Sequence, residues 1–148
     1  MIEFLGLFIF IAGFIIGLGA VTVIDIHGFL GRRSPYWTEA TIRTHKVTKP
    51  LIWVGTLLAV IGGLFFYSQN PITWIPITHL FIFTTLILNG LFLTFYISPY
   101  LLKKEKEGRS REILPFELQL YISISFIISF MGWWSSVFLL VWYLFNHV

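Results

Sequence analysis

The sequence predicts an all-α integral membrane protein built as a bundle of four helices, and three observations lead to this class. Of the 148 residues, 57% are hydrophobic and 11% are charged, and the mean hydropathy of +0.84 is well above that of a water-soluble domain. The charged residues occupy short islands, with long uncharged stretches between them. The period-two alternation of a membrane barrel is absent, so these stretches must be helical if they lie in lipid.

The uncharged stretches give four spans within a single transmembrane domain of residues 1–148. Residues 4–24 contain no ionisable side chain, and about 20 helical residues suffice to cross about 30 Å of hydrocarbon. Residues 51–102 are long enough for two crossings, with a break at residues 68–71, and residues 118–148 give a fourth. We therefore predict spans at about residues 4–26, 50–68, 74–100 and 117–145.

The segment between the first two predicted spans is polar enough to leave the hydrocarbon. Ser34 followed by Pro35 is typical of a helix N-cap and a first helical position. We expect a short helix at about residues 35–48, on or near the membrane surface. Pro50 then either kinks this helix into the second span or begins that span afresh.

The basic residues predict how the chain is oriented in the membrane. All ten Lys and Arg fall within residues 32–49 and 103–111, that is, after the first and third spans, whereas the connection between the second and third spans carries no charge. The positive-inside rule therefore places both basic loops in the cytoplasm and both termini outside. We expect the host membrane to be the bacterial inner (plasma) membrane.

The composition also excludes several classes of function. The chain has no Cys, which rules out disulfides, thiolate metal sites, iron–sulfur clusters and thiol oxidoreductases. The spans use up most of the length, so there is no room for a nucleotide-binding or nucleic-acid-binding module, and we expect no nucleic acid partner. No Ser has a recognisable base and orienting group, so the sequence indicates no nucleophilic enzyme and leaves enzymatic activity undecided.

Small residues form stripes along three of the spans, where they let helix backbones approach in a lipid bilayer. We expect the stripes to pack the helices of one chain together, and the alternative is a face for a homo-oligomer or a larger membrane complex. Polar side chains can also connect helices, and Asn89 in the third span is predicted to form a hydrogen bond with Ser129 or Trp133 in the fourth. The stripes consist of Gly6, Gly13, Gly17 and Ala20 in the first span, Gly55, Ala59 and Gly63 in the second, and Ser125, Ser129, Gly132 and Ser136 in the fourth.

Ionisable groups at membrane depth are costly and are functional candidates by default. Asp25 and His27 lie near the inner end of the first span, and His45 lies shortly before the second. His27 and His45 are candidate axial ligands of haem b, with Arg43 and Lys46, beside Lys49, as partners of its propionates. Alternatively, His27, His45 and Asp25 are candidate ligands of a divalent transition metal.

Helix geometry sets a condition on this site. Residues two apart on a helix point about 200° away from each other, so Asp25 and His27 converge only if the first helix ends between them. Otherwise we expect Asp25 to pair with Arg43 or Lys46 and the cluster to hold no cofactor.

Four segments carry a resemblance to known membrane proteins: GLGAVTVIDIHGF, HKVTKPLIWVG, LILNGLFLTFYISPYLL and SFMGWWSS. They resemble the pattern of small bacterial four-helix membrane proteins, and the overall build is similar to the CopD-like and cytochrome b561-like bundles. This resemblance implies copper or haem held by His residues on the helices. The b561 pattern has two His pairs at two depths, whereas here only His27 and His45 form a plausible pair, so the resemblance favours a one-haem or non-haem protein.

The sequence thus predicts a small membrane protein that binds haem or a metal at an inner-leaflet cluster and transfers electrons or handles metal. One alternative is a structural or assembly subunit without a cofactor. Another is a small transporter with Asp25 and Asn89 on its pathway.

Overall fold

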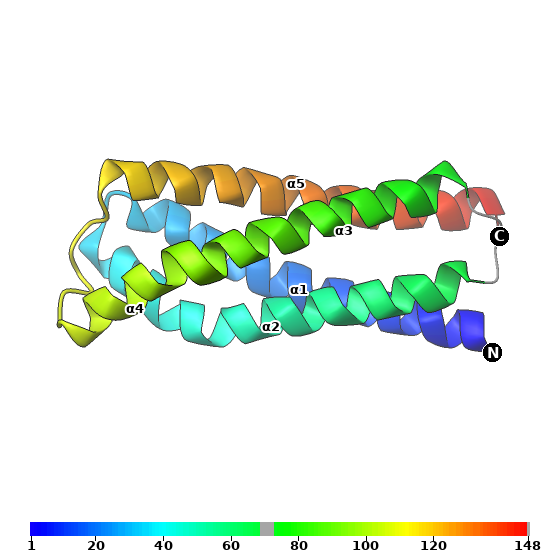
Figure 1. The fold of residues 1–148 in the computed structure, drawn as a ribbon, viewed down its shortest axis with the longest axis horizontal. Helices are drawn as coiled ribbons and strands as arrows, with labels where there is room; N and C mark the ends of the chain where they lie inside the picture. The colour runs from blue at the N-terminus through cyan, green and yellow to red at the C-terminus, as the bar shows by residue number, and fades with distance from the viewer. Residues whose placement is uncertain (69–72, 148) are drawn as a thin grey trace.

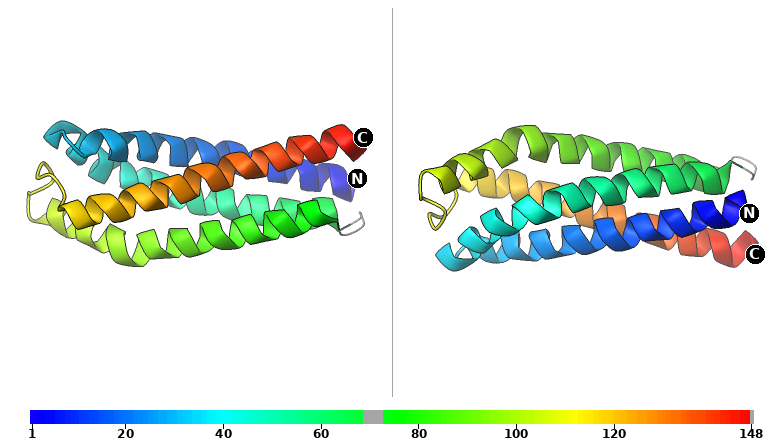
Figure 2. Two further views of the ribbon diagram at one scale, coloured as in Figure 1. Left: turned by 90° about the horizontal axis from the view of Figure 1, so that it is seen from above. Right: turned by 90° about the horizontal axis from the view of Figure 1, so that it is seen from below.

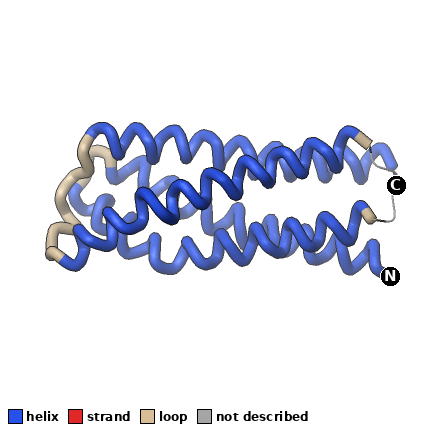
Figure 3. Tube along the Cα trace, viewed as in Figure 1, coloured by secondary structure: helices blue, strands red, loops and turns tan. Residues whose placement is uncertain are grey.

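A computed structural model describes residues 1–68 and 73–147, and its secondary structure is helical throughout, with no strand among these residues (Figure 3). The elements are α1 (Ile2–Gly31), α2 (Pro35–Tyr67), α3 (Trp74–Phe92), the π-helical turn η1 (Leu93–Ile97), α4 (Ser98–Lys106) and α5 (Phe116–His147). They form four long segments, because α3, η1 and α4 follow one another without a break, and each segment is long and apolar enough to cross a membrane. The prediction of an all-α fold is confirmed for the described residues, and so is the prediction of four helices long and apolar enough to span a membrane. Of the predicted break at residues 68–71, residues 69–71 lie outside the described part of the chain.

The helices run as two antiparallel hairpins (Figures 1 and 2). The first hairpin is α1 with α2, which make by far the most extensive contact in the bundle, and the second is α3, η1 and α4 with α5. Both chain termini lie at one end of the bundle (Figure 1). We call the opposite end the basic end: it holds residues 32–34 and 107–115, which connect α1 to α2 and α4 to α5, and it carries the two groups of Lys and Arg.

α2 is one continuous helix, with Pro50 inside it. Of the two alternatives for the helix predicted at about residues 35–48, the structure contains the one in which this helix continues through Pro50 into the second span. Pro50 lacks an N–H, so the helix loses one backbone hydrogen bond there without ending. The first part of α2, cyan in Figure 2, runs at an angle to the remainder, which is the expected effect of a proline within a helix. The predicted start is confirmed, since Ser34 is the N-cap and Pro35 opens the helix.

Small residues allow the close contact of α1 with α2. A Cβ atom on Gly13 would collide with the backbone of Ala59, and one on Gly55 would collide with the backbone of Gly17. The predicted stripe is therefore present for Gly13, Gly17, Gly55 and Ala59. Its next member differs from the prediction: Gly62 faces the backbone of α1, whereas a Cβ atom on Gly63 would only touch the ring of Phe10, at 3.5 Å.

The third segment contains a wide turn. The N–H of Ser98 donates to the carbonyl of Leu93, five residues back, which is the π-helical pattern. Pro99 supplies a cause, because it lacks an N–H and its ring crowds the carbonyl of Phe95 four residues earlier. The turn changes which side chains of the following helix face α2, and Ser98 is among those that do.

Candidate functional site

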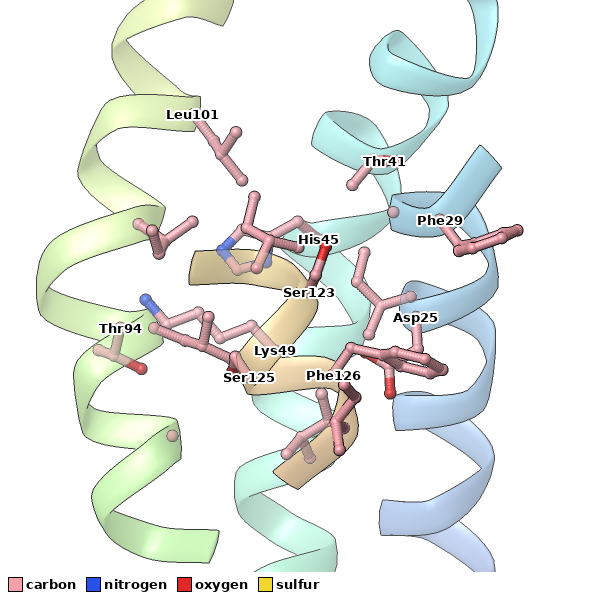
Figure 4. Close-up of a pocket in the computed structure, with 18 of the residues that line it drawn as sticks. Asp25, Phe29, Thr41, His45, Lys49, Thr94, Leu101, Ser123, Ser125 and Phe126 are labelled. Carbon is pink, nitrogen blue, oxygen red and sulfur yellow. The ribbon is translucent and has the colours of Figure 1, made fainter. Parts of the chain in front are cut away.

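A cavity of about 300 Å³ lies between the two hairpins, in the half of the bundle nearer the basic end (Figure 4). Most of its wall is apolar and comes from Ile, Leu, Phe and Trp side chains of all four segments. Polar and charged side chains are set into this wall: Asp25, Arg32, Thr41, His45, Lys49, Thr94, Ser123 and Ser125. A mostly apolar cavity with a few polar groups is the usual form of a small-molecule binding site.

One side of the cavity is polar because α2 meets the start of α4 there. His45 and Lys49 are four residues apart and so share a face of α2. His45 Nε2 lies 2.9 Å from Ser98 Oγ, and Lys49 Nζ donates to the same oxygen at 3.2 Å. One turn further along α2, Trp53 Nε1 donates to Thr94 Oγ1 at 3.3 Å. The partners of this face of α2 are therefore Thr94, which lies in the π-helical turn, and Ser98, which follows the turn directly.

Asp25 contributes a carboxylate from the α1 side. Its Oδ2 atom is buried and has no hydrogen-bond partner among the residues that the structure describes. In Figure 4 Asp25 extends from α1, while the Lys49 side chain extends toward the helix that carries Thr94. A buried carboxylate oxygen without a partner is costly, so Asp25 is the group most in need of a ligand in this cavity.

The charges that line the cavity have no counter-ions within the described part of the chain. Lys49 and Arg32 have no carboxylate within ion-pair distance, and the guanidinium of Arg32 instead lies 5.9 Å from the centre of the Phe29 ring. Asp25 likewise forms no ion pair with any of the described residues. The cavity wall therefore carries one acidic and two basic side chains, none of which has an ion-pair partner among the described residues.

The predicted ligand residues are only partly brought together. Asp25 and His45 line the same cavity, whereas His27 does not. His27 Nδ1 lies 3.1 Å from Thr44 Oγ1, and the His27 ring packs against Trp37, with ring centres 5.3 Å apart. Among the described residues there is no group of three or more His, Asp or Glu side chains placed to hold a metal ion.

The predicted partners of an anionic group have partners of their own. Arg43 pairs with Glu39 at 2.6 Å, and Lys46 pairs with Glu105 at 2.8 Å. Neither Arg43 nor Lys46 lines the cavity. The alternative in which Asp25 pairs with one of them is not what the structure contains, because each of these cations is held by a Glu.

The sequence places Lys49 beside the candidate propionate partners without singling it out, and it does not indicate Ser98 as a site residue. Lys49 was one of several basic residues near the second span, and only the fold shows that it faces the cavity. Ser98 is brought to the cavity by the π-helical turn. The available signal was Pro99 within the third apolar stretch, since a proline inside a helix marks a local irregularity.

Two further polar groups of residues lie outside the cavity and connect helices. His79 is buried; its Nε2 donates to the carbonyl of Ser136 at 2.9 Å, and its Nδ1 lies 3.0 Å from the hydroxyl of Tyr67. Asn89 bonds to Ser129 Oγ at 2.9 Å, which confirms the predicted contact between the third and fourth spans. His79 thereby connects α2, α3 and α5, and Asn89 connects α3 and α5.

The loop that closes the basic end is held by ion pairs. Arg109 donates to both carboxylate oxygens of Glu112, at 2.8 and 2.7 Å, and the almost fully buried Lys104 lies 3.3 Å from the same carboxylate. Hydrogen bonding from Arg109, assisted by Lys104, lowers the pKa of Glu112 to about 2. The loop is therefore built around a carboxylate that is ionised at neutral pH.

The chain was compared with protein-family models, with curated proteins and with solved structures, and none of the three comparisons gives a match. The resemblance to CopD-like and cytochrome b561-like bundles therefore stays a prediction.

Proposed function

We propose that this protein is a membrane-embedded binding protein whose cavity accepts the head-group region of an amphiphilic molecule from the surrounding bilayer. The observation that carries the proposal is the Asp25 Oδ2 atom, which is buried without a hydrogen-bond partner among the described residues, in a cavity of about 300 Å³ with mostly apolar walls. Apolar walls favour a ligand with an apolar body, and the free charges favour one with a polar head. The volume is at the low end of ligand pockets, so it suits a head group and the adjoining part of a chain.

The depth of the cavity supports an amphiphile. Lys49 is 18 residues before Tyr67, the last residue of α2, which corresponds to about 27 Å along a helix. Since the hydrocarbon of a bilayer is about 30 Å thick, a helix that spans it places Lys49 near one boundary. This is the level at which lipid head groups meet acyl chains.

The orientation belongs to the same proposal. The basic residues at the basic end favour a cytoplasmic location for it, and both termini then lie outside. The cavity accordingly faces the inner leaflet, and in a bacterium the host is the inner membrane.

The proposal is tested by filling the cavity. Gly28 lines it, and a Cβ atom at this position would meet only Ile122, at 3.8 Å, so Gly28→Phe places a ring in the free space. Gly19→Phe is the matched control on the same helix, because nothing lies within 4 Å of a Cβ atom there. The measurement is native mass spectrometry of the purified protein after extensive detergent washing. We expect the wild type and Gly19→Phe to retain lipid and Gly28→Phe to lose it. A wild type that retains none, or equal retention by all three, would overturn the proposal.

A second candidate is the cofactor-binding function that the sequence predicts, in which haem or a transition metal serves electron transfer or metal handling. The observation that favours it is the imidazole of His45 in the cavity wall. His45 Nε2 is bonded to Ser98, which leaves Nδ1 for a metal. His27 would have to leave Thr44 to act as a second ligand. The test is the absorption spectrum and metal content of the purified protein: a haem band lost in His45→Ala supports this candidate, and a colourless, metal-free protein contradicts it.

A further inference from the structure

We infer that the head group accepted by the cavity is zwitterionic, with a primary ammonium and a phosphate, as in phosphatidylethanolamine. This inference rests on the proposed function and names its ligand class. It follows from the signs of the unpaired charges, because an acidic side chain on α1, Asp25, and a basic one on α2, Lys49, line the same cavity.

The acidic side chain of the site, Asp25, comes from α1. Asp25 Oδ2 is buried without a hydrogen-bond partner in the described part of the chain, so a donor is missing on this wall. A primary ammonium carries three N–H donors together with a positive charge, and both properties match a carboxylate. A quaternary ammonium has the charge but no N–H, so it would leave the oxygen without a hydrogen bond.

The positive charge of the site comes from Lys49 and Arg32. Neither has an ion-pair partner among the described residues. Lys49 is fixed by its hydrogen bond to Ser98 Oγ at 3.2 Å, and its remaining donors are available. Lys and Arg are the usual partners of phosphate oxygens in proteins.

Ligands of a single charge fit this site less well. An anionic head group would satisfy Lys49 and Arg32 but would bring a second negative charge near Asp25. A purely cationic ligand would satisfy Asp25 but would leave two cations facing it. Asp25 Oδ2 is buried and Lys49 is partly buried, and unpaired charges away from water are costly. A ligand that carries both signs is therefore the one that compensates both side chains.

The test compares lipids that differ only in the head group. Detergent-washed wild-type protein is given an equimolar mixture of dioleoyl phosphatidylethanolamine, phosphatidylglycerol and phosphatidylcholine, and bound lipid is read by native mass spectrometry. We expect phosphatidylethanolamine to be retained about tenfold over each of the others, the size of effect expected from one additional charged hydrogen bond. This comparison uses the unmodified chain and so does not depend on the folding of a variant.

Two variants then assign the preference to the two walls. Asp25→Asn keeps the shape of the side chain, and we expect it to abolish the preference for phosphatidylethanolamine over phosphatidylglycerol. Lys49→Gln should reduce the retention of both lipids by about tenfold or more, because both carry the phosphate. Lys106→Gln is the matched control, since Lys106 is exposed and lies outside the cavity lining, and it should change nothing.

The outcomes separate this inference from the proposed function. Retention of all three lipids without preference, or a preference for phosphatidylglycerol, overturns the zwitterionic head group and leaves a lipid-binding cavity. A preference for phosphatidylethanolamine that survives Asp25→Asn overturns the role of Asp25. Retention of no lipid overturns the proposed function itself.

Discussion

Asn89 and Ser125 exchange two hydrogen bonds between α3 and α5. Asn89 Nδ2 donates to the carbonyl of Ser125 at 3.1 Å, and the hydroxyl of Ser125 donates to Asn89 Oδ1 at 2.8 Å. Asn89 Nδ2 also donates to Ser129 Oγ at 2.9 Å, so both ends of the amide are satisfied by α5. Since apolar side chains gain nothing by leaving lipid, such bonds help to determine which helices associate in a membrane.

Asn89→Ala should therefore weaken the second hairpin. Three hydrogen bonds between α3 and α5 are lost, and values for polar contacts between membrane helices suggest a cost of about 1 to 2 kcal/mol. The measurement is thermal unfolding in a mild detergent. Asn146→Ala is the control, because Asn146 is exposed and, within the described part of the chain, its side chain bonds to the carbonyl of Trp142 in its own helix. Equal losses in the two variants would argue against a special role for Asn89.

Gly13→Leu should push α1 and α2 apart. A Cβ atom there would collide with the backbone of Ala59, which cannot move without moving α2. We expect a loss of about 1 to 3 kcal/mol or more in stability, as for overpacked interiors. Gly19→Leu, for which there is open space within 4 Å of the Cβ position, should be tolerated. The readout is the unfolding temperature in detergent, and a Gly13→Leu protein as stable as Gly19→Leu would contradict the packing seen here.

Tyr67→Phe should destabilise the half of the bundle nearer the termini. The carbonyl of Ser136 accepts the hydrogen bond from His79 Nε2, so in the neutral imidazole Nδ1 is an acceptor and the Tyr67 hydroxyl donates to it. Removal of the hydroxyl leaves a buried acceptor without a donor, at a cost of about 1 to 3 kcal/mol. Tyr96→Phe is the control because Tyr96 is 55% exposed. Stability measured by unfolding in detergent should fall in the first variant only.

The loop after α4 should open in acid. The pKa of Glu112 is lowered from its usual value of 4.5 to about 2, chiefly by hydrogen bonding from Arg109. The stabilisation is therefore complete above pH 4.5 and is lost as the pH falls through about 2. Amide hydrogen exchange of residues 108–113, corrected for the intrinsic effect of pH, should accelerate in that interval. Glu112→Gln should exchange fast already at pH 6, and the same protection as in the wild type would count against the ion pairs.

The proposed orientation can be tested because the chain has no Cys of its own. Ser110→Cys lies in the loop at the basic end, and Asn146→Cys lies in the last turns of α5 at the other end. An impermeant thiol reagent added to intact cells should label Asn146→Cys, whereas Ser110→Cys should require permeabilised cells. Labelling of Ser110→Cys in intact cells would reverse the orientation.

The fold was largely predictable from the sequence because lipid leaves few options. An uncharged stretch of 20 or more residues must satisfy its backbone internally, so the four spans, the N-cap at Ser34 and the glycine contacts of α1 with α2 follow from local pattern. The continuity of α2 did not follow, because Pro50 permits either a kink or a new helix, and packing against α1 decides between them.

The candidate site was predictable only in part. Asp25 and His45 were selected because ionisable groups near membrane depth are rare, and both line the cavity. The direction of His27 depends on local contacts with Thr44 and Trp37, which the spacing of residues does not specify. Lys49 could not be singled out from Arg43 and Lys46, because the choice depends on which cations find a Glu partner on another turn or another helix.

The π-helical turn is equivalent to one extra residue inserted into an otherwise ordinary helix. Each residue of an α-helix turns the chain by about 100°, so deletion of one residue from 93–97 would restore regular winding and rotate α4 by about that angle relative to α3. Ser98 would then turn away from His45 and Lys49, and if the deleted residue is Phe95 or Tyr96, every polar residue of the cavity is still present in the sequence. The register of a single helix, as much as the identity of its side chains, is what gives this membrane protein its polar wall.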